Sequence, residues 1–307
     1  MPVVKEKFAA ITANPDPFWF LASRKERLKK YPVRSLRNAI ARRAIHSSIN
    51  LGFMKKVVRA KTFWGEKIFI PSRSAFHLFE KGFFDGEDFR LTGYIINTLR
   101  EGDVFIDGGA NIGWYTMIAS DLVGDRGQVH SFEATERTFE ILKANVAARK
   151  NVRANRLALW EKEGVVSFSD FGFKFDVANT VIQEKERIDY YEKLVTHNPE
   201  YRVVSVPAVT LDGYCTKNDI KPTFIKLDCE GAEFEILSAA ENVLKHRPTI
   251  ACEILGSSLR SGAGAKLVRA LGKFGYSPYA IRDDFSVEPL DMEGKFELVN
   301  AIFKTRP

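Results

Sequence analysis

From Asp88 to the C-terminus, short apolar runs alternate with segments in which apolar residues recur every three or four positions. The first pattern predicts buried β-strands and the second predicts amphipathic helices. Strands that alternate with helices of about ten to fifteen residues form βαβ units. The chain is therefore expected to adopt an α/β fold with a doubly wound, mainly parallel sheet of seven strands. The expected strands are residues 103–107, 127–133, 151–159, 223–228, 248–255 and 296–305, and the expected helices are residues 89–100, 135–150, 232–246 and 265–276.

The chain before this alternation has a different pattern. Residues 18–60 show helix-like apolar spacing broken by Pro32, and residues 61–74 alternate as a hairpin does. We therefore expect residues 1–75 to form a basic, mostly helical extension with a short hairpin, and residues 76–307 to form the main domain. Within that domain, residues 163–171 predict a β-hairpin arm. The polar, aromatic-rich insert 170–202 is expected to face the substrate.

Charge separates the same two regions. Residues 1–61 contain 15 Lys and Arg against three acids, a net charge of +12, so the remaining residues carry −5 of the total of +7. Such a concentration is typical of a solvated helical face, and it also suits an anionic partner such as a membrane surface, a nucleic acid or an acidic glycan. Of these partners we expect an anionic membrane surface. Nucleic acid is not expected. No uncharged apolar stretch has the roughly 18 residues needed to span a bilayer, and the first twenty residues lack a signal-peptide run, so we expect a cytoplasmic protein, peripheral to the inner membrane face.

Four of the expected strands finish in an acid: Asp107, Glu133, Asp228 and Glu253. In an open parallel sheet, ligands bind outside the carboxyl ends of the strands. An unpaired carboxylate is costly there, whereas one that meets ligand hydroxyls, a cation or helix amides is satisfied. The sequence therefore predicts a polar ligand site at this edge of the sheet.

The first of these strands is followed by the glycine-rich segment GGANIG, residues 108–113. Glycines permit positive φ and close approach of a ligand, as in dinucleotide-binding proteins. Asn111, however, stands where a pyrophosphate site requires a second glycine. Glu133 lies twenty residues after Gly113, at a strand end where an acid can accept both hydroxyls of a ribose. The three cysteines, Cys215, Cys229 and Cys252, have no CxxC spacing and indicate neither a zinc site nor a disulfide framework.

At this point the chain resembles the FkbM-type S-adenosylmethionine-dependent methyltransferases, over roughly residues 80–255. Two positions differ from the common pattern: Ala134 stands in place of a proline, and Gly108 in place of a hydrophobic residue. The segments that carry the resemblance occur in the family's order and are VFIDGGANIGWYT, HSFEATERTFEILKANV, LALWEKEGVVSF, VTLDGYC, FIKLDCEGAEFEILSAA and HRPTIACEIL.

The resemblance implies a Rossmann-like class I fold with S-adenosylmethionine as cofactor. It places Glu133 at the ribose, Ala158 near the adenine, and the glycine-rich turn at the methionine end of the cofactor. The cofactor-binding residues implied in this way are Asp107, Gly108, Gly109, Ala110, Asn111, Gly113, Glu133 and Ala158.

The resemblance also implies O-methylation of a hydroxyl on a sugar, glycan or secondary metabolite. An alcohol acceptor must lose a proton, and Asp228, Glu230 and Glu253 are the candidates for that step. A divalent cation would suit such acids, although no metal motif is recognisable. We expect Lys226 to pair with Asp228, since both lie on one face of a strand, and Glu233 to support the helix that follows. Two alternatives stay open: an NAD-dependent oxidoreductase, and a methyltransferase-like scaffold that binds RNA or membranes through the basic extension.

Overall fold

The computed structural model describes residues 2–13, 57–72, 86–170, 202–255, 263–291 and 298–305, together with a few single positions between the first three ranges. The chain forms two compact units. The smaller contains Met1–Thr98 and Asp283–Phe285, and the larger contains Leu99–Arg282 and Ser286–Pro307. The domain boundary expected between residues 75 and 76 stays a prediction.

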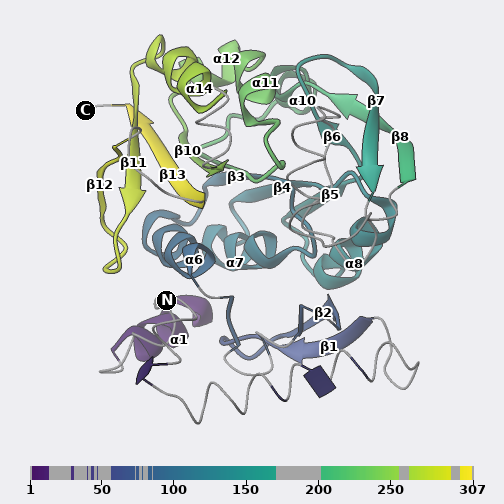
Figure 1. Ribbon diagram of the computed structural model, residues 1–307, viewed down its shortest axis with the longest axis vertical. Coiled ribbons are helices and arrows are strands. Elements are labelled where there is room, and N and C mark those ends of the chain that lie inside the picture. Colours follow the sequence, from purple (N-terminus) through teal and green to yellow (C-terminus); the bar gives the residue numbers. More distant parts are fainter. Residues whose placement is uncertain are drawn as a thin grey trace. The chain divides into compact units, whose positions relative to one another are not determined.

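An eight-stranded sheet forms the centre of the larger unit, in the order β12-β11-β13-β10-β9-β3-β4-β5 (Figure 1). The five strands from β10 to β5 are parallel, whereas β13 runs antiparallel to both of its neighbours. Seven strands were predicted and six of them were assigned to residues, whereas the sheet has eight, because β11 and the three-residue β12 are added at one edge. The strands are β3 (Val104–Gly108), β4 (Gln128–Phe132), β5 (Val152–Asn155), β9 (Phe224–Leu227), β10 (Thr249–Leu255), β11 (Tyr276–Ile281), β12 (Val287–Pro289) and β13 (Leu298–Thr305).

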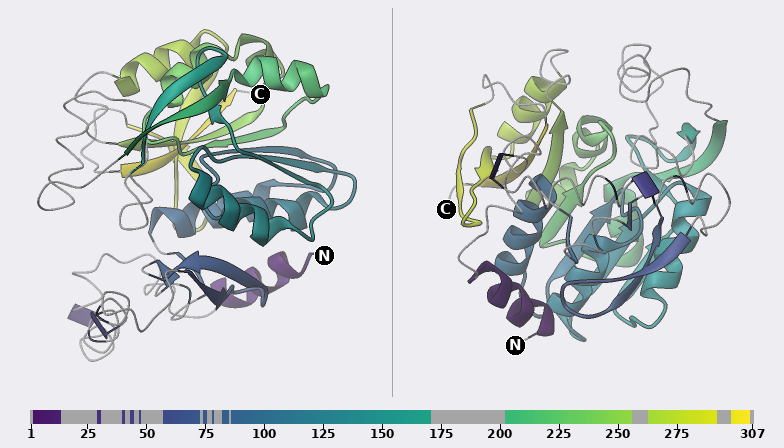
Figure 2. Two further views of the ribbon diagram at one scale, coloured as in Figure 1. Left: turned by 90° about the vertical axis from the view of Figure 1, so that its right-hand side faces the viewer. Right: turned by 60° about the horizontal axis from the view of Figure 1, so that its bottom comes forward.

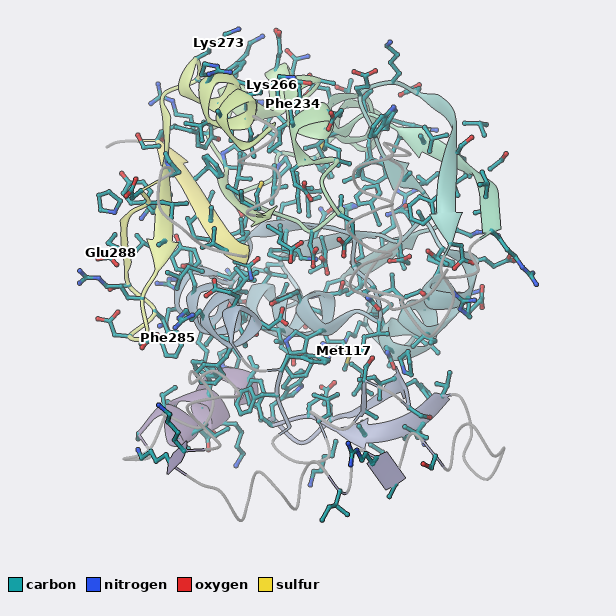
Figure 3. The ribbon with its side chains drawn as sticks, in the orientation of Figure 1. Met117, Phe234, Lys266, Lys273, Phe285 and Glu288 are labelled. Atoms are coloured by element: carbon teal, nitrogen blue, oxygen red, sulfur yellow. The ribbon has the colours of Figure 1, made fainter. Side chains whose placement is uncertain are left out.

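Helices cover both faces of this sheet, as a doubly wound fold requires (Figure 2). On one face lie α7 (Trp114–Val123) and α8 (Glu136–Val146). The other face carries α10 (Leu211–Asn218), α11 (Glu233–Ser238), α12 (Glu241–Lys245) and α14 (Ala263–Gly272). Met117 marks the first layer, and Phe234 and Lys266 mark the second (Figure 3). The predicted α/β class with a mainly parallel sheet is confirmed.

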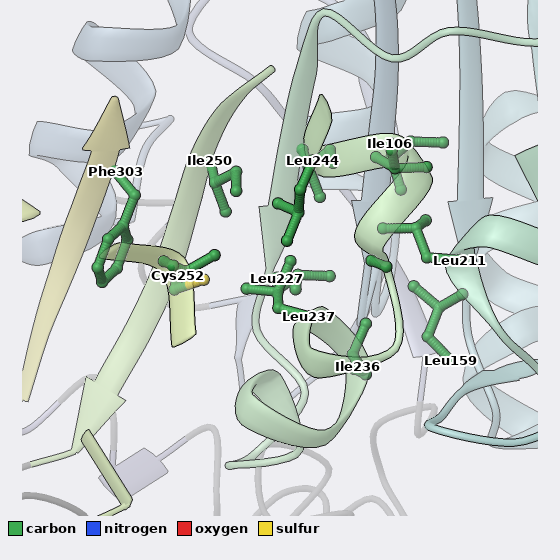
Figure 4. Packing of buried hydrophobic residues seen from close by; sticks show 14 of the residues in the cluster. Ile106, Leu159, Leu211, Leu227, Ile236, Leu237, Leu244, Ile250, Cys252 and Phe303 are labelled. Atoms are coloured by element: carbon green, nitrogen blue, oxygen red, sulfur yellow. The ribbon is translucent and has the colours of Figure 1, made fainter. Parts of the chain in front are cut away.

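The core on the second face joins strands and helices that are far apart in the sequence. Ile106, Leu227 and Ile250 from three adjacent strands pack with Leu237 and Leu244 (Figure 4). Full burial of each such side chain contributes about 1.5–3 kcal/mol. This apolar layer fixes the strand register, and the register in turn determines which side chains reach the carboxyl edge.

One predicted helix, residues 232–246, is divided into α11 and α12. The backbone leaves the helical conformation at Ala239 and Ala240, and α12 begins directly afterwards. The Asp212 carboxylate accepts hydrogen bonds from the amides of Asn242 and Val243 at 2.9 Å each. A side chain from α10 therefore caps the first turn of α12 and stabilises a new helix start that propensity alone does not predict.

The predicted strand 151–159 is also divided, into β5 and the short β6 (Ala158–Leu159). The second piece belongs to a separate three-stranded sheet, in the order β6-β8-β7. In that sheet β7 (Gly164–Asp170) pairs antiparallel with β8 (Arg202–Val209), so the predicted arm has its second strand beyond residue 201. The insert between these strands lies outside the described residues.

The smaller unit has an aromatic core. It contains α1 (Val3–Thr12), α6 (Glu87–Thr98) and a hairpin of β1 (Val57–Lys61) and β2 (Lys67–Pro71). The predicted hairpin is present, but its first strand begins at Val57, so the prediction that residues 57–60 are helical was wrong. The rings of Phe63 and Phe83 stack at 4.2 Å, and Phe8 packs on both Phe89 and Phe285. Most of the segment predicted as helical, residues 18–60, lies outside the described residues. Among the helices described, none is long and apolar enough to cross a bilayer.

Candidate active site

The register of the parallel strands explains how the four predicted acids are arranged. Gly108 in β3 lies beside Phe132 in β4 and Leu227 in β9, and Leu227 lies beside Cys252 in β10. Glu133, Asp228 and Glu253 each follow one of these level residues, so they emerge together at the carboxyl edge. Asp107 lies one layer deeper. Two of the four do not close their strands as predicted, because β3 continues past Asp107 to Gly108 and β10 continues past Glu253 to Leu255.

The turn after β3, residues 108–113, is called the glycine turn below. Gly109 has a φ of +68°, and a Cβ at this position would lie 1.9 Å from the carbonyl oxygen of Asp228. Asn111 has a φ of +48°, a left-handed conformation that asparagine tolerates. The amide of Ala110 donates to the carbonyl of Phe132 at 2.9 Å. The predicted requirement for glycine is thus confirmed at Gly109, where two backbones meet closely.

Gly108 has a different environment from Gly109. A Cβ at this position would lie 2.6 Å from Leu227 Cδ2 and 3.0 Å from Leu159 Cδ1. The two leucines fill the space that a side chain at residue 108 would need. This departure from the pattern is therefore a change in packing and removes no polar group from the site.

Glu133 follows β4 and is held against the glycine turn. Its side chain is buried, and the two carboxylate oxygens accept hydrogen bonds from the amides of Asn111 at 3.0 Å and Thr135 at 2.9 Å. Burial raises the pKa of the Glu133 carboxyl to about 7, while these amide hydrogen bonds favour the ionised form. The Thr135 side chain also hydrogen-bonds this carboxylate, so with three of about four acceptor sites in use it retains capacity for a ligand hydroxyl.

Asp107 is engaged inside the protein. It is fully buried, its Oδ2 accepts a hydrogen bond from the Thr116 hydroxyl at 2.6 Å, and its Oδ1 lies 3.3 Å from the Lys226 ammonium nitrogen. It therefore supports the base of the site. Thr116 was not among the predicted site residues, since its link to Asp107 depends on how α7 packs on β3 and no local pattern reveals it.

The turn after β9, residues 228–233, is called the acidic turn. Asp228 and Glu230 lie here and Glu253 lies on the neighbouring strand, and carboxylate oxygens of the three are all within 4.8 Å of one another. All three side chains are half-buried. Such a group can accept a proton or hold a divalent cation. The structure thus brings together the three acids that the sequence analysis named as catalytic candidates.

Glu233 braces the acidic turn. Its Oε1 accepts hydrogen bonds from the amides of Cys229 at 2.8 Å and Gly231 at 3.2 Å. Burial raises the pKa of the Glu233 carboxyl to about 7. The expected structural role is confirmed, although the carboxylate acts on the turn before the helix. The expected ion pair is also present, since Lys226 Nζ lies 3.6 Å from Asp228 Oδ2.

Ala158 lies in β6 and is buried in a small apolar cluster with Ala134, Phe168, Val206 and Ala208. Ala134 directly follows Glu133, so the cluster is adjacent to the end of β4. The proximity of Ala158 to an adenine stays a prediction. The three cysteines are free, as expected.

Several solved structures resemble this chain weakly. They include a precorrin-6y C5,15-methyltransferase from Geobacter metallireducens, with 14% identity, 74% of this chain and 91% of that chain covered, and a TM-score of 0.39. A SAM-dependent O-methyltransferase from Thermotoga maritima has 13% identity, coverage of 81% and 78%, and a TM-score of 0.39. Fibrillarin from Aeropyrum pernix, solved with bound S-adenosyl-L-methionine, has 13% identity, coverage of 69% and 74%, and a TM-score of 0.35.

No curated protein matches the chain in sequence. The model of one protein family does match, and its description is methyltransferase FkbM domain. The match covers residues 107–278, which is more than half of the chain and includes the glycine turn, Glu133 and the acidic turn. The chain therefore belongs to the family of FkbM methyltransferase domains.

Proposed function

We propose that this protein transfers the methyl group of S-adenosylmethionine to a hydroxyl of a sugar, glycan or secondary metabolite. The observation that carries the proposal is the position of Glu133, a buried carboxylate held by backbone amides beside a turn that needs glycine. Bound S-adenosylmethionine supplies an electrophilic methyl group on a sulfonium. All further chemistry would fall to the side chains of this chain.

The donor groups at the glycine turn fit this cofactor. The Glu133 carboxylate retains acceptor capacity for a ribose hydroxyl beside the donors from Asn111 and Thr135. The absence of a side chain at Gly109 keeps the turn closely packed on Asp228. A rim of carboxylates attracts a cationic sulfonium and repels an anionic pyrophosphate, and this argues against the NAD-dependent alternative.

The acid cluster supplies the second half of the proposal. A hydroxyl acceptor becomes a better nucleophile as its proton leaves, and a carboxylate oxygen of Asp228, Glu230 or Glu253 is placed to accept that proton. Alignment of the acceptor accounts for much of the remaining catalysis in a displacement at carbon. We propose that the insert between β7 and β8 contributes to acceptor binding.

The first test is calorimetric titration of S-adenosylmethionine into the wild type and into Glu133→Ala. The wild type is expected to bind in the micromolar range, and the substitution is expected to weaken binding by at least about tenfold, or 1.4 kcal/mol. Glu136→Ala is the matched control, because that glutamate is exposed and pairs only at the surface with Arg156 at 3.2 Å. Binding of NAD without binding of S-adenosylmethionine would overturn the proposal in favour of the oxidoreductase.

The second test addresses the acceptor. Incubation with isotopically labelled S-adenosylmethionine and a panel of glycans should transfer the label to oxygen, as mass spectrometry of the product would show. Parallel reactions with EDTA, and with Mg²⁺ restored, ask whether the cluster of Asp228, Glu230 and Glu253 works through a cation. Transfer to nitrogen or carbon alone would contradict O-methylation.

We further propose that the basic residues 1–61 bind an anionic membrane surface, on the strength of their net charge of +12. Sedimentation of the full chain with phosphatidylserine vesicles should fall as salt is raised. Replacing Lys29 and Lys30 by Gln should weaken binding by about 2 kcal/mol, since each charge near the surface contributes about 1 kcal/mol. Absent or salt-insensitive binding would contradict this role, as would preferential binding of RNA.

A further inference from the structure

Lys226 is a buried lysine on β9 whose partners belong to two different turns. Its side chain is 3% exposed, and Asp107, its partner in the strand register, is completely buried. Nζ lies 3.3 Å from Asp107 Oδ1 and 3.6 Å from Asp228 Oδ2. Burial opposes the positive charge, but the two carboxylates outweigh it and raise the pKa of Lys226 above its usual value. The side chain is therefore a fixed cation beneath the site.

The same ammonium group also contacts the glycine turn. Nζ donates to the carbonyl of Gly109 at 3.0 Å and lies 3.4 Å from the carbonyl of Gly108. The ring of Tyr115, in the first turn of α7, lies 5.3 Å from Nζ. An ammonium has three N–H donors, and its hydrogen bonds go to carbonyls of the glycine turn, while the carboxylates of Asp107 and Asp228 lie within ion-pair distance of Nζ.

The backbones of the two turns meet at this point. The amide of Asp228 donates to the carbonyl of Gly108 at 3.1 Å, and the Asp228 carbonyl occupies the space next to Gly109. A shift of the glycine turn would therefore move Asp228, and the reverse also holds. Lys226 lies under this junction and contacts both sides of it through side-chain and carbonyl oxygens.

We propose that Lys226 is a positioning residue that fixes the glycine turn and Asp228 relative to each other. The assignment of cofactor to one turn and acceptor proton to the other rests on the proposed function. Because Lys226 is buried, it acts through its neighbours and does not itself contact substrate. Through Lys226, the conformation of the glycine turn thus determines the distance between the bound methyl donor and the acceptor base.

The test uses the combined substitution Lys226→Met with Asp107→Asn. Replacing Lys226 alone would leave Asp107 buried without its counter-charge, and such a protein can fail to fold. The combined variant removes both charges and keeps the volume of the side chains. Arg149→Met is the control, because Arg149 and Asp121 form a largely buried ion pair in the same unit, with Asp121 near the end of α7 that is opposite the glycine turn.

Hydrogen exchange of the protein without ligand is the first readout. Amides of residues 108–113 and of residues 228–232 are expected to exchange about tenfold faster in the combined variant than in the wild type. Arg149→Met should leave both segments unchanged. Unchanged exchange, or faster exchange in one turn only, would overturn the role of Lys226 without any reference to catalysis.

Binding and turnover form the second readout. The combined variant is expected to bind S-adenosylmethionine about tenfold more weakly and to keep a kcat about tenfold lower even when the cofactor is saturating. Adding Asp228→Asn to the combined variant should lower kcat by less than Asp228→Asn does in the wild type. The reason is that loss of Lys226 and substitution of Asp228 both affect the Asp228 carboxylate. Full recovery of kcat at saturating cofactor would overturn the inference. Failure of the wild type to bind the cofactor would instead overturn the proposed function, and the exchange experiment would still decide the inference.

Discussion

The glycine turn and the acidic turn follow neighbouring parallel strands, and each is braced by a buried glutamate. Glu133 accepts the amide of Asn111 in the first, and Glu233 accepts the amides of Cys229 and Gly231 in the second. Burial raises the pKa of both carboxyls to about 7. The two turns differ in where their strand acids lie. Asp107 is completely buried and engaged by Thr116 and Lys226, whereas Asp228 is half-exposed near two further acids.

This difference teaches that position at a strand end does not determine what an acid does. Asp107 lies one residue before the level of the edge and is enclosed by its neighbours, so its role is to hold other groups. Asp228 lies one residue beyond the last paired residue of β9 and reaches the surface of the site. A difference of two positions along the paired strands therefore separates a structural carboxylate from one that can meet an acceptor.

The largest expected effect comes from breaking the contact between the two turns. In Gly109→Ala, the new methyl group would collide with the Asp228 carbonyl, and the residue would keep a φ of +68°. We expect the free energy of unfolding to fall by about 3 kcal/mol or more. Affinity for S-adenosylmethionine should fall by about 100-fold or more. Chemical denaturation and calorimetry measure the two effects.

Gly102→Ala separates the strain from the collision. Gly102 has a φ of +89° in the same unit, and nothing lies within 4 Å of its Cβ position. Its substitution should cost only the backbone term, about 1–2 kcal/mol, and leave cofactor affinity unchanged. Equal effects of the two substitutions would show that the close approach at Gly109 is not important.

The second prediction tests whether the acidic turn serves the acceptor only. Asp228→Asn keeps the size of the side chain and removes its ability to accept a proton, so kcat should fall by about 100-fold. The affinity for S-adenosylmethionine should stay within about twofold of the wild type. Steady-state methyl transfer and calorimetry give the two values. The exposed Asp125, changed to Asn, is the control.

If Asp228→Asn, Glu230→Gln and Glu253→Gln all retain wild-type kcat, the three acids do not remove the proton. The acceptor would then lose it directly to solvent. The glycine turn would still bind the cofactor, but the acidic turn would have no role in catalysis.

The third prediction concerns pH and the cofactor side alone. The ionised form of Glu133 is the better acceptor for ribose hydroxyls, and burial holds the pKa of this carboxyl at about 7. Protons therefore compete with the ligand, and affinity for S-adenosylmethionine should rise as pH rises from 6 to 8, by up to about tenfold per unit below the pKa. Glu133→Gln should bind weakly with little dependence on pH. Affinity that falls over this range would contradict the assignment.

Much of this site could be predicted from the sequence, because the signals for it are local. The glycines, Asp228, Glu230 and the pairing of Lys226 with Asp228 all follow from strands that end in a turn, whereas Glu253 lies inside β10. The depth of Asp107 could not be predicted, since it depends on the register between β3 and β9.

Other features depended on contacts made at long range. The break between α11 and α12 requires Asp212, which is about thirty residues away in the sequence. The partner of β7 was missed because β8 follows a long insert, and β11 was missed because its residues are mostly half-buried and include Pro278. Strand pairings of this kind are specified by packing, which no short window of sequence contains.

The smallest expected effect comes from comparing the two bracing glutamates with each other. A carboxyl whose pKa is raised in the folded state favours folding below its unfolded pKa near 4.5, and this contribution is lost as pH rises through about 7. Removal of the ionisable group in Glu233→Gln should therefore make the free energy of unfolding less dependent on pH between 5 and 8, by about 1–3 kcal/mol. Urea titrations at several pH values measure this.

Glu233 accepts hydrogen bonds from amides of its own turn. The Glu233→Gln variant should therefore keep the wild-type dependence of S-adenosylmethionine affinity on pH, whereas Glu133→Gln should lose it. If Glu233→Gln abolished that dependence as well, the two turns would bind the cofactor together, and the separation of a cofactor turn from an acceptor turn would be wrong.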